Sequence, residues 1–185
     1  MTGPRSVVSM VAIVVLVTAA AVPATAQGVR SVGMGDSHCV VVVTGETGQG
    51  QLTTGSPRCF DDLSEAMGFA SAGSLQPAPG AAGDTVSPEG AVAAGVSRFI
   101  LGIHYEHSGG RGSSITVVGS SCSGGYWNAP SWLANKISSS YHGCGTLIHH
   151  DLPDLGGAAY LTTGIGSTQN LPGFNDRAES VRYLP

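Results

Sequence analysis

Hydrophobic positions along this chain fall into short runs separated by glycine-rich stretches. Residues 40–43 are four consecutive valines, and residues 99–105 carry an apolar run that ends Ile-His-Tyr. Runs rich in β-branched and aromatic residues and bounded by turn residues predict short strands. One stretch, residues 61–70, predicts a short helix instead, because Asp62 is placed as an N-cap and Glu65 follows three residues later.

The longest apolar run lies at the start of the chain. It covers residues 7–22, follows Arg5, and precedes Ala24, Thr25 and Ala26. A basic residue, an apolar run and a small-residue cleavage pattern are typical of a secretory signal peptide. The run is about 16 residues, shorter than the roughly 20 that a membrane span needs. We therefore expect residues 1–26 to be cleaved, and the mature protein to be secreted and extracellular, without a membrane anchor.

Composition narrows the class of protein further. Charged residues make up 11% of the chain, glycine accounts for 28 of 185 residues, and the net charge is −4. This balance favours strands and turns over long surface helices and provides no basic footprint for nucleic acid.

Four cysteines, an even number in an exported chain, predict two disulfides in an oxidising compartment. Three connectivities are possible. We expect Cys39 to pair with Cys59, and Cys122 with Cys144, because each pair lies within one segment of the chain.

Changes in composition along the chain also predict three parts after the signal peptide. Residues 27–73 predict a small N-terminal unit with a strand, a turn and the short helix, too small to bury much core without its disulfide. Residues 74–95 are rich in Ala, Gly and Pro and predict a linker. Residues 96–185 form the informative domain.

That domain contains an internal duplication. The segment from Gly102 matches the segment from Leu147 without gaps at an offset of 45 residues, and residues 132–140 match residues 173–181 at an offset of 41. Each copy reads as strand, turn and strand. One copy alone would leave an apolar sheet face exposed, so we expect the two copies to pack together as layers.

These residues resemble the βγ-crystallin family, whose domain is two Greek-key motifs packed as a sandwich. Each family motif opens with two spaced aromatic residues and a glycine in a folded hairpin. The corresponding positions are Tyr105, Gly110 and Gly112 in the first copy and His150, Leu155 and Gly157 in the second. The glycine is present in both copies, whereas only one of the four aromatic positions is. The resemblance covers about half of the chain and implies a mainly β fold.

The resemblance also implies a calcium-type segment in each copy. Residues 134–139 and 175–180 match the family pattern. The candidate ligands, all with the oxygen donors that calcium prefers, are Asn135, Ser138, Asn175, Asp176 and Glu179. Ala134 lacks a donor, and Glu179 replaces a hydroxyl residue, so weak binding is expected. The alternative is that these side chains only hold their loops through local hydrogen bonds.

Two histidines flank an acid in His104-Tyr105-Glu106-His107. Strand alternation places His104 and His107 on opposite faces, so they cannot share a metal without a bulge. We expect Tyr105 to face the core and His104 and Glu106 to face solvent. A surface zinc or copper site shared by His104 and His149, which are equivalent in the two copies, is the alternative.

The remaining candidate residues suggest little chemistry. No nucleophile motif of a hydrolase is present, so the chain is not expected to be an enzyme. Trp132 is expected in the core. Tyr126 and Trp127 are expected to pack under a loop, the alternative being a partly exposed pair that forms a binding surface. The main hypothesis is a secreted, monomeric structural or binding protein. The alternative, also implied by the resemblance to Streptomyces-type metalloproteinase inhibitors, is an extracellular protease inhibitor acting through the region between Cys122 and Cys144.

Overall fold

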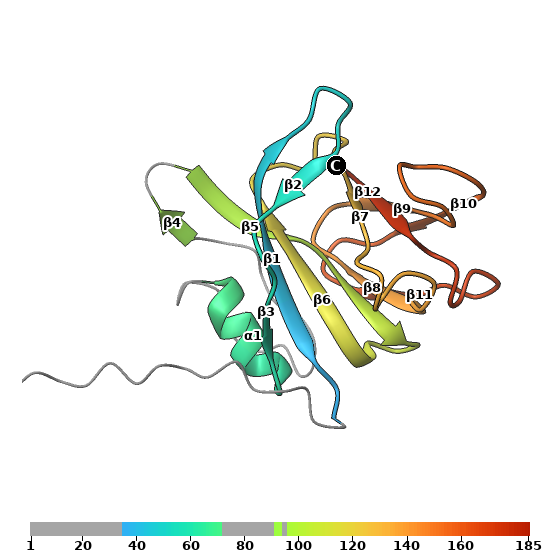
Figure 1. Cartoon of the computed structure of the whole chain (residues 1–185), viewed down its shortest axis with the longest axis horizontal. Helices are drawn as coiled ribbons and strands as arrows, with labels where there is room; N and C mark the ends of the chain where they lie inside the picture. Colours follow the sequence, from blue (N-terminus) through green and yellow to red (C-terminus); the bar gives the residue numbers. More distant parts are fainter. Residues whose placement is uncertain (1–34, 72–90, 94–95) are drawn as a thin grey trace, which may run out of the picture. The chain divides into compact units, whose positions relative to one another are not determined.

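The computed structural model describes residues 35–71, 91–93 and 96–185 (Figure 1). The expected signal peptide lies outside these ranges, as does most of the expected linker. Within them the protein is mainly β, with one short helix and two sheets. No helix in the described ranges is long and apolar enough to cross a membrane.

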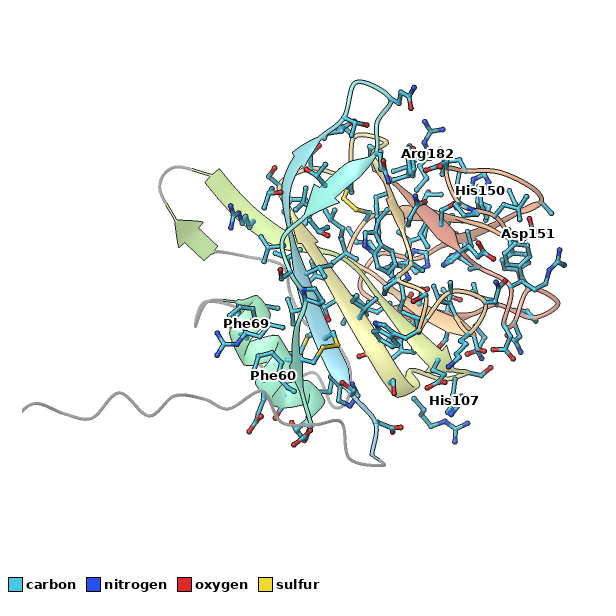
Figure 2. All side chains as sticks on the ribbon, in the orientation of Figure 1. Phe60, Phe69, His107, His150, Asp151 and Arg182 are labelled. Carbon is cyan, nitrogen blue, oxygen red and sulfur yellow. A yellow bond between two sulfur atoms is a disulfide. The ribbon has the colours of Figure 1, made fainter. Side chains whose placement is uncertain are left out.

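The N-terminal segment holds three strands and the helix. They are β1 (His38–Glu46), β2 (Leu52–Thr54), β3 (Arg58–Phe60) and α1 (Leu63–Ala70). As predicted, Asp62 caps α1, because its carboxylate accepts hydrogen bonds from the backbone N–H groups of Ser64 (2.7 Å) and Glu65 (3.3 Å). The side chain of Phe60 at the end of β3 packs against that of Phe69 in α1, with ring centroids 5.6 Å apart (Figure 2).

The rest of the chain provides the remaining strands. They are β4 (Ala91–Ala93), β5 (Val96–His107), β6 (Arg111–Gly119), β7 (Tyr126–Asn128), β8 (Ser139–His142), β9 (Thr146–His150), β10 (Ala159–Thr163), β11 (Thr168–Asn170) and β12 (Ser180–Leu184). The first four strands after β4 and the last four are the two copies of the duplicated sequence.

The two copies exchange one strand each. The first sheet has the order β11-β8-β5-β6-β1-β2, with β3 paired to β1 and β4 paired to β5, and the second has the order β10-β9-β12-β7. The third strand of the first copy, β7, therefore lies in the sheet of the second copy, and β11 lies in the sheet of the first. Each copy thus completes the sheet of the other.

The folded hairpins explain the glycines that the two copies share. Gly112 and Gly157, which are 45 residues apart, have φ angles of 77° and 71°. A β-carbon on Gly157 would lie 2.0 Å from the Asp151 carboxylate. Positive φ and this close approach both favour glycine. The duplication seen in the sequence is thus repeated in the backbone.

The N-terminal segment is built into the first sheet. β1 pairs in parallel with β6, with Val40 opposite Thr116 and Val42 opposite Val118. Residues 32–185 form one compact unit. The sequence suggested a separate small unit for residues 27–73; its described part instead adds strands and core side chains to the sheet, because the valine run has apolar neighbours on both faces.

Two hydrophobic clusters result. One lies between the sheets, with Leu101 and Val117 from the first and Leu147 and Val181 from the second. Two sheets that meet over a shared apolar layer are consistent with a β sandwich. The second cluster lies on the other face of the first sheet, where Ala66 and Ala70 of α1 and strand residues cover Ile103. The central strand β5 is therefore buried on both faces.

Both predicted disulfides are confirmed. Cys39 bonds to Cys59, which lies directly opposite it on β3, and Cys122 bonds to Cys144. Two disulfides are typical of an oxidising, extracellular environment.

Candidate functional site

The two calcium-type loops lie beside each other. Ile137 and Ala178, equivalent residues 41 positions apart, form an antiparallel bridge. The backbone N–H of Asn135 donates to the Ala178 carbonyl (3.1 Å), and that of Asp176 donates to the Ile137 carbonyl (3.2 Å). Asn135 and Asp176 have positive φ angles of 59° and 56°. The loops are therefore a matched pair with the same backbone shape.

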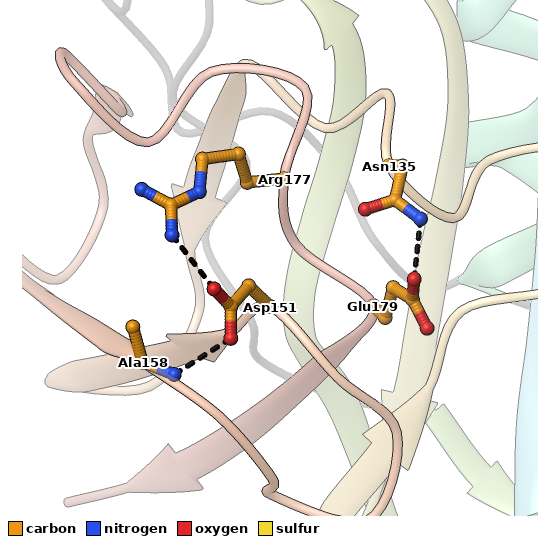
Figure 3. A network of polar contacts seen from close by, with 5 residues as sticks. All are labelled: Asn135, Asp151, Ala158, Arg177 and Glu179. Carbon is orange, nitrogen blue, oxygen red and sulfur yellow. Dashed lines mark hydrogen bonds and ion pairs between the residues drawn. The ribbon is translucent and has the colours of Figure 1, made fainter.

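The candidate ligands are paired with one another across these loops. The Ser138 hydroxyl donates to the Asp176 carboxylate (2.9 Å). The Asn135 amide donates to the Glu179 carboxylate (Figure 3). Since Ser138 is equivalent to Glu179, and Asn135 to Asp176, the two contacts join the same two loop positions. The structure thus brings four of the five predicted residues together.

The fifth predicted residue, Asn175, is used differently. In the orientation that satisfies its neighbours, its amide donates to the carbonyl oxygens of Leu171 (2.9 Å) and Ser138 (3.3 Å). Its side chain therefore braces the backbone of both loops.

Sequence reasoning missed two basic residues of the site. Lys136 Nζ lies 3.6 Å from Glu106 Oε1, and Arg177 Nη2 lies 2.7 Å from Asp151 Oδ2 (Figure 3). The other Asp151 oxygen accepts the Ala158 N–H at 2.6 Å. The hydrogen bond from Arg177 is the main reason that the pKa of Asp151 is lowered. The alignment contained the signal, because both acids and both bases match at the two offsets.

A shallow depression of about 580 Å³ lies beside the first loop. It is lined by Glu106, His107, Ser108, Arg111, Asn135, Lys136, Ser138 and Asp176. Acidic and basic side chains both line it, so it presents no uniform charge to a ligand.

In this structure the oxygen donors of these loops are engaged by the protein itself. Calcium needs six to eight oxygen ligands. Each nearby carboxylate already contacts a protein donor or cation: Lys136 for Glu106, the Asn135 amide for Glu179, and Arg177 for Asp151. The described residues contain no group of three or more His, Cys, Asp or Glu side chains placed to hold a metal.

The second cluster of polar side chains is buried between the sheets. His104 Nδ1 lies 2.8 Å from Ser140 Oγ, and His104 Nε2 lies 2.8 Å from the Tyr183 hydroxyl. Ser140 Oγ also lies 2.9 Å from His149 Nε2. These four side chains form one continuous hydrogen-bonded chain that joins the two sheets.

The expected solvent-facing position of His104 was wrong, because this residue is fully buried. Alternation correctly placed His104 and Tyr105 on opposite faces, but the second sheet covers the face of His104 and α1 helps to cover the face of Tyr105, so both side chains are inside. His104 and His149 do lie together, with ring centroids 6.1 Å apart, yet in the core and not at the surface. A surface metal site shared by these two residues is thereby excluded.

The buried histidines are neutral at pH 7. Burial lowers the pKa of His149 to about 3 and that of His142 to about 4, and it places the pKa of His104 well below its usual value. The two ring nitrogens of His142 have no hydrogen-bond partner among the described residues. The three rings are fully buried, and those of His104 and His149 join the two sheets, so this cluster is part of the core.

The packing expected for Trp127 is confirmed, whereas the core position expected for Trp132 was wrong. Trp127 is buried and stacks on His104, with ring centroids 5.4 Å apart. Trp132 is 37% exposed. Trp127 is buried because of the strand exchange, since β7 carries it into the inner face of the second sheet.

No family model, no curated protein and no solved structure matches this chain.

Proposed function

We propose that the chain is a secreted, non-enzymatic structural or binding protein whose residues 96–185 form a βγ-crystallin-like domain. The observation that carries the proposal is the reciprocal strand exchange, in which each copy gives its third strand to the sheet of the other. Two Greek-key motifs packed as a sandwich account for this order. The matched hairpins and paired loops support the same assignment.

A binding or structural role is favoured over catalysis by the burial of reactive groups. The described residues contain two serine–histidine pairings, Ser140 with His104 and His149, and Ser114 with His38, and both serine hydroxyls lie on fully buried residues. Acid–base catalysis requires contact between such groups and a substrate. The exposed surface carries paired ions and turns instead.

A second candidate, an extracellular protease inhibitor, is favoured by one exposed loop. Ser120, Ser121 and Ser123 are exposed between β6 and β7, and the disulfide from Cys122 pins this loop to Cys144. The neighbouring Gly124 N–H donates to the Tyr183 carbonyl at 2.9 Å. A rigid, preorganised loop loses little entropy when it docks.

One titration separates the two candidates. The oxidised mature protein is added to a thermolysin-type metalloprotease and to a subtilisin-type serine protease. The structural proposal expects an intact chain with full protease activity. Stoichiometric loss of protease activity supports the inhibitor, and Ser121→Ala and Ser123→Ala variants then test the loop. Rapid digestion of the oxidised chain contradicts both candidates.

A further inference from the structure

The two ion pairs of the loops are equivalent in the duplicated structure. Glu106 and Asp151 are 45 residues apart, and Lys136 and Arg177 are 41 apart, which are the same offsets that relate the hairpins and the loops. Each basic residue is the third residue of its calcium-type segment. Glu106 is the last residue but one of β5, and Asp151 directly follows β9. The same arrangement thus occurs twice with different side chains.

Each acid is adjacent to a calcium-type residue of its own copy. The Glu179 N–H donates to the His150 carbonyl (2.8 Å), next to Asp151, and the Ser138 N–H donates to the Tyr105 carbonyl (3.0 Å), next to Glu106. Each loop therefore contacts the end of the first strand of its own copy. Oxygen atoms are concentrated there, so a positive charge stabilises this position. Lys136 and Arg177 supply that charge.

We propose, resting on the crystallin-like assignment above, that Lys136 and Arg177 are built-in counter-ions that replace a metal ion in the two loops. The Asn135–Glu179 and Ser138–Asp176 hydrogen bonds join the two loops to each other, so the loops hold their shape without calcium. A calcium ion that entered the second loop would have to displace the guanidinium of Arg177, which can form two hydrogen bonds to a carboxylate. The positive charge of Arg177 would also repel the ion.

The proposal predicts that removing one cation creates a calcium response. In Arg177→Gln, Asp151 loses its neighbouring positive charge but keeps its hydrogen bond from the Ala158 N–H. Arg177 is 47% exposed on its side chain, so the variant is expected to fold. Arg177→Lys retains the charge. Arg182→Gln is the matched control, since it also removes one charge and one hydrogen bond, from Arg182 Nε to the Gly124 carbonyl.

The experiment measures the melting temperature of the oxidised mature protein in EGTA and in millimolar CaCl₂, with NaCl matched for ionic strength. We expect no calcium-dependent shift in the unmodified protein, in Arg177→Lys or in Arg182→Gln, and a rise of several degrees in Arg177→Gln. Far-UV circular dichroism checks that each variant is folded.

Two results would overturn the proposal. A calcium-dependent rise in the unmodified protein would show that the loops accept the metal as they are. A folded Arg177→Gln variant with no calcium response would show that the guanidinium does not stand in for a metal. Neither result depends on protease inhibition, so failure here is distinct from failure of the proposed function.

Discussion

Ser139 and Ser180 make the same two hydrogen bonds in the two copies, 41 residues apart. The Ser139 hydroxyl donates to the His107 carbonyl (2.6 Å) and accepts the Gly110 N–H (3.0 Å). The Ser180 hydroxyl donates to the Leu152 carbonyl (2.8 Å) and accepts the Leu155 N–H (3.1 Å). Both serines are fully buried. Each hydroxyl therefore holds the folded hairpin of its own copy against the last strand.

Replacing Ser180 with alanine should destabilise the protein by about 1–3 kcal/mol, because two hydrogen bonds, to the Leu152 carbonyl and from the Leu155 N–H, are lost. Urea unfolding of the oxidised protein at pH 7.5 measures the change. Ser131→Ala, at an exposed position, is the control and should leave the unfolding midpoint unchanged. Equal stability of the two variants would contradict the role given to the hydroxyl.

Stability should fall as the pH is lowered from about 7 to 5. The pKa of His142 drops from 6.5 to about 4 on folding and that of His149 to about 3, and the pKa of His104 shifts in the same direction. The unfolded chain therefore takes up protons near pH 6.5 while the folded chain does not. The stability contributed by the neutral rings is complete above pH 6.5 and is lost as the pH falls toward the folded values. His142 and His149 each contribute roughly 2 kcal/mol to the loss between pH 7 and 5, and His104 adds to it in the same direction.

Urea unfolding at pH 7.5, 6.0 and 5.0, followed by the fluorescence of buried Trp127, measures this loss. His142→Gln removes one of the buried rings whose pKa is lowered and should reduce the loss of stability between pH 7 and 5 by roughly 2 kcal/mol, since linkage sums over groups. A midpoint that does not move between pH 7.5 and 5.0 would disprove neutral burial of the histidines.

Gly143→Ala should be strongly destabilising. A β-carbon at this position would lie 1.8 Å from the carbonyl oxygen of Ile100, which belongs to the central strand and cannot move aside. A loss of about 2–4 kcal/mol is expected, or failure to fold at 37 °C. Gly48→Ala is the control, because no atom lies within 4 Å of the added carbon. Thermal unfolding of the two variants, compared with the unmodified protein, tests the expectation.

Removing either disulfide should lower the free energy of unfolding. The two bonds span 20 and 22 residues, and loop-closure entropy predicts a loss of about 3 kcal/mol for each. The double variants Cys39→Ala/Cys59→Ala and Cys122→Ala/Cys144→Ala are compared by denaturant unfolding. A negligible loss in one pair alone would show that its loop is already held by strand pairing.

The features that the sequence predicted correctly are local ones. Asp62 caps the helix it was expected to cap, and the positive φ angles of Gly112 and Gly157 follow from the residues themselves. The cysteine pairs are close along the chain, and this sufficed to choose their pairing. The paired loops were found because two aligned copies tend to place equivalent residues in equivalent surroundings.

The features that the sequence could not predict depend on residues that are far apart along the chain. Alternation at His104 and Tyr105 divides a strand into two faces but does not say which face is covered, and here α1 and the second sheet cover both. The parallel pairing of β1 with β6 joins segments 76 residues apart, as in the contact of Ser114 with His38. Lys136 and Arg177 became informative only once their acidic partners were seen.

The exchange of β7 and β11 has a consequence for how such a protein holds together. A single copy on its own would lack one strand of its sheet, and its third strand would have no partner. Two separate copies would have to associate in solution to complete both sheets. Residues 143–145 join the copies in one chain, so this meeting occurs at a high effective concentration that dilution cannot lower. A protein of this design keeps its fold at any abundance.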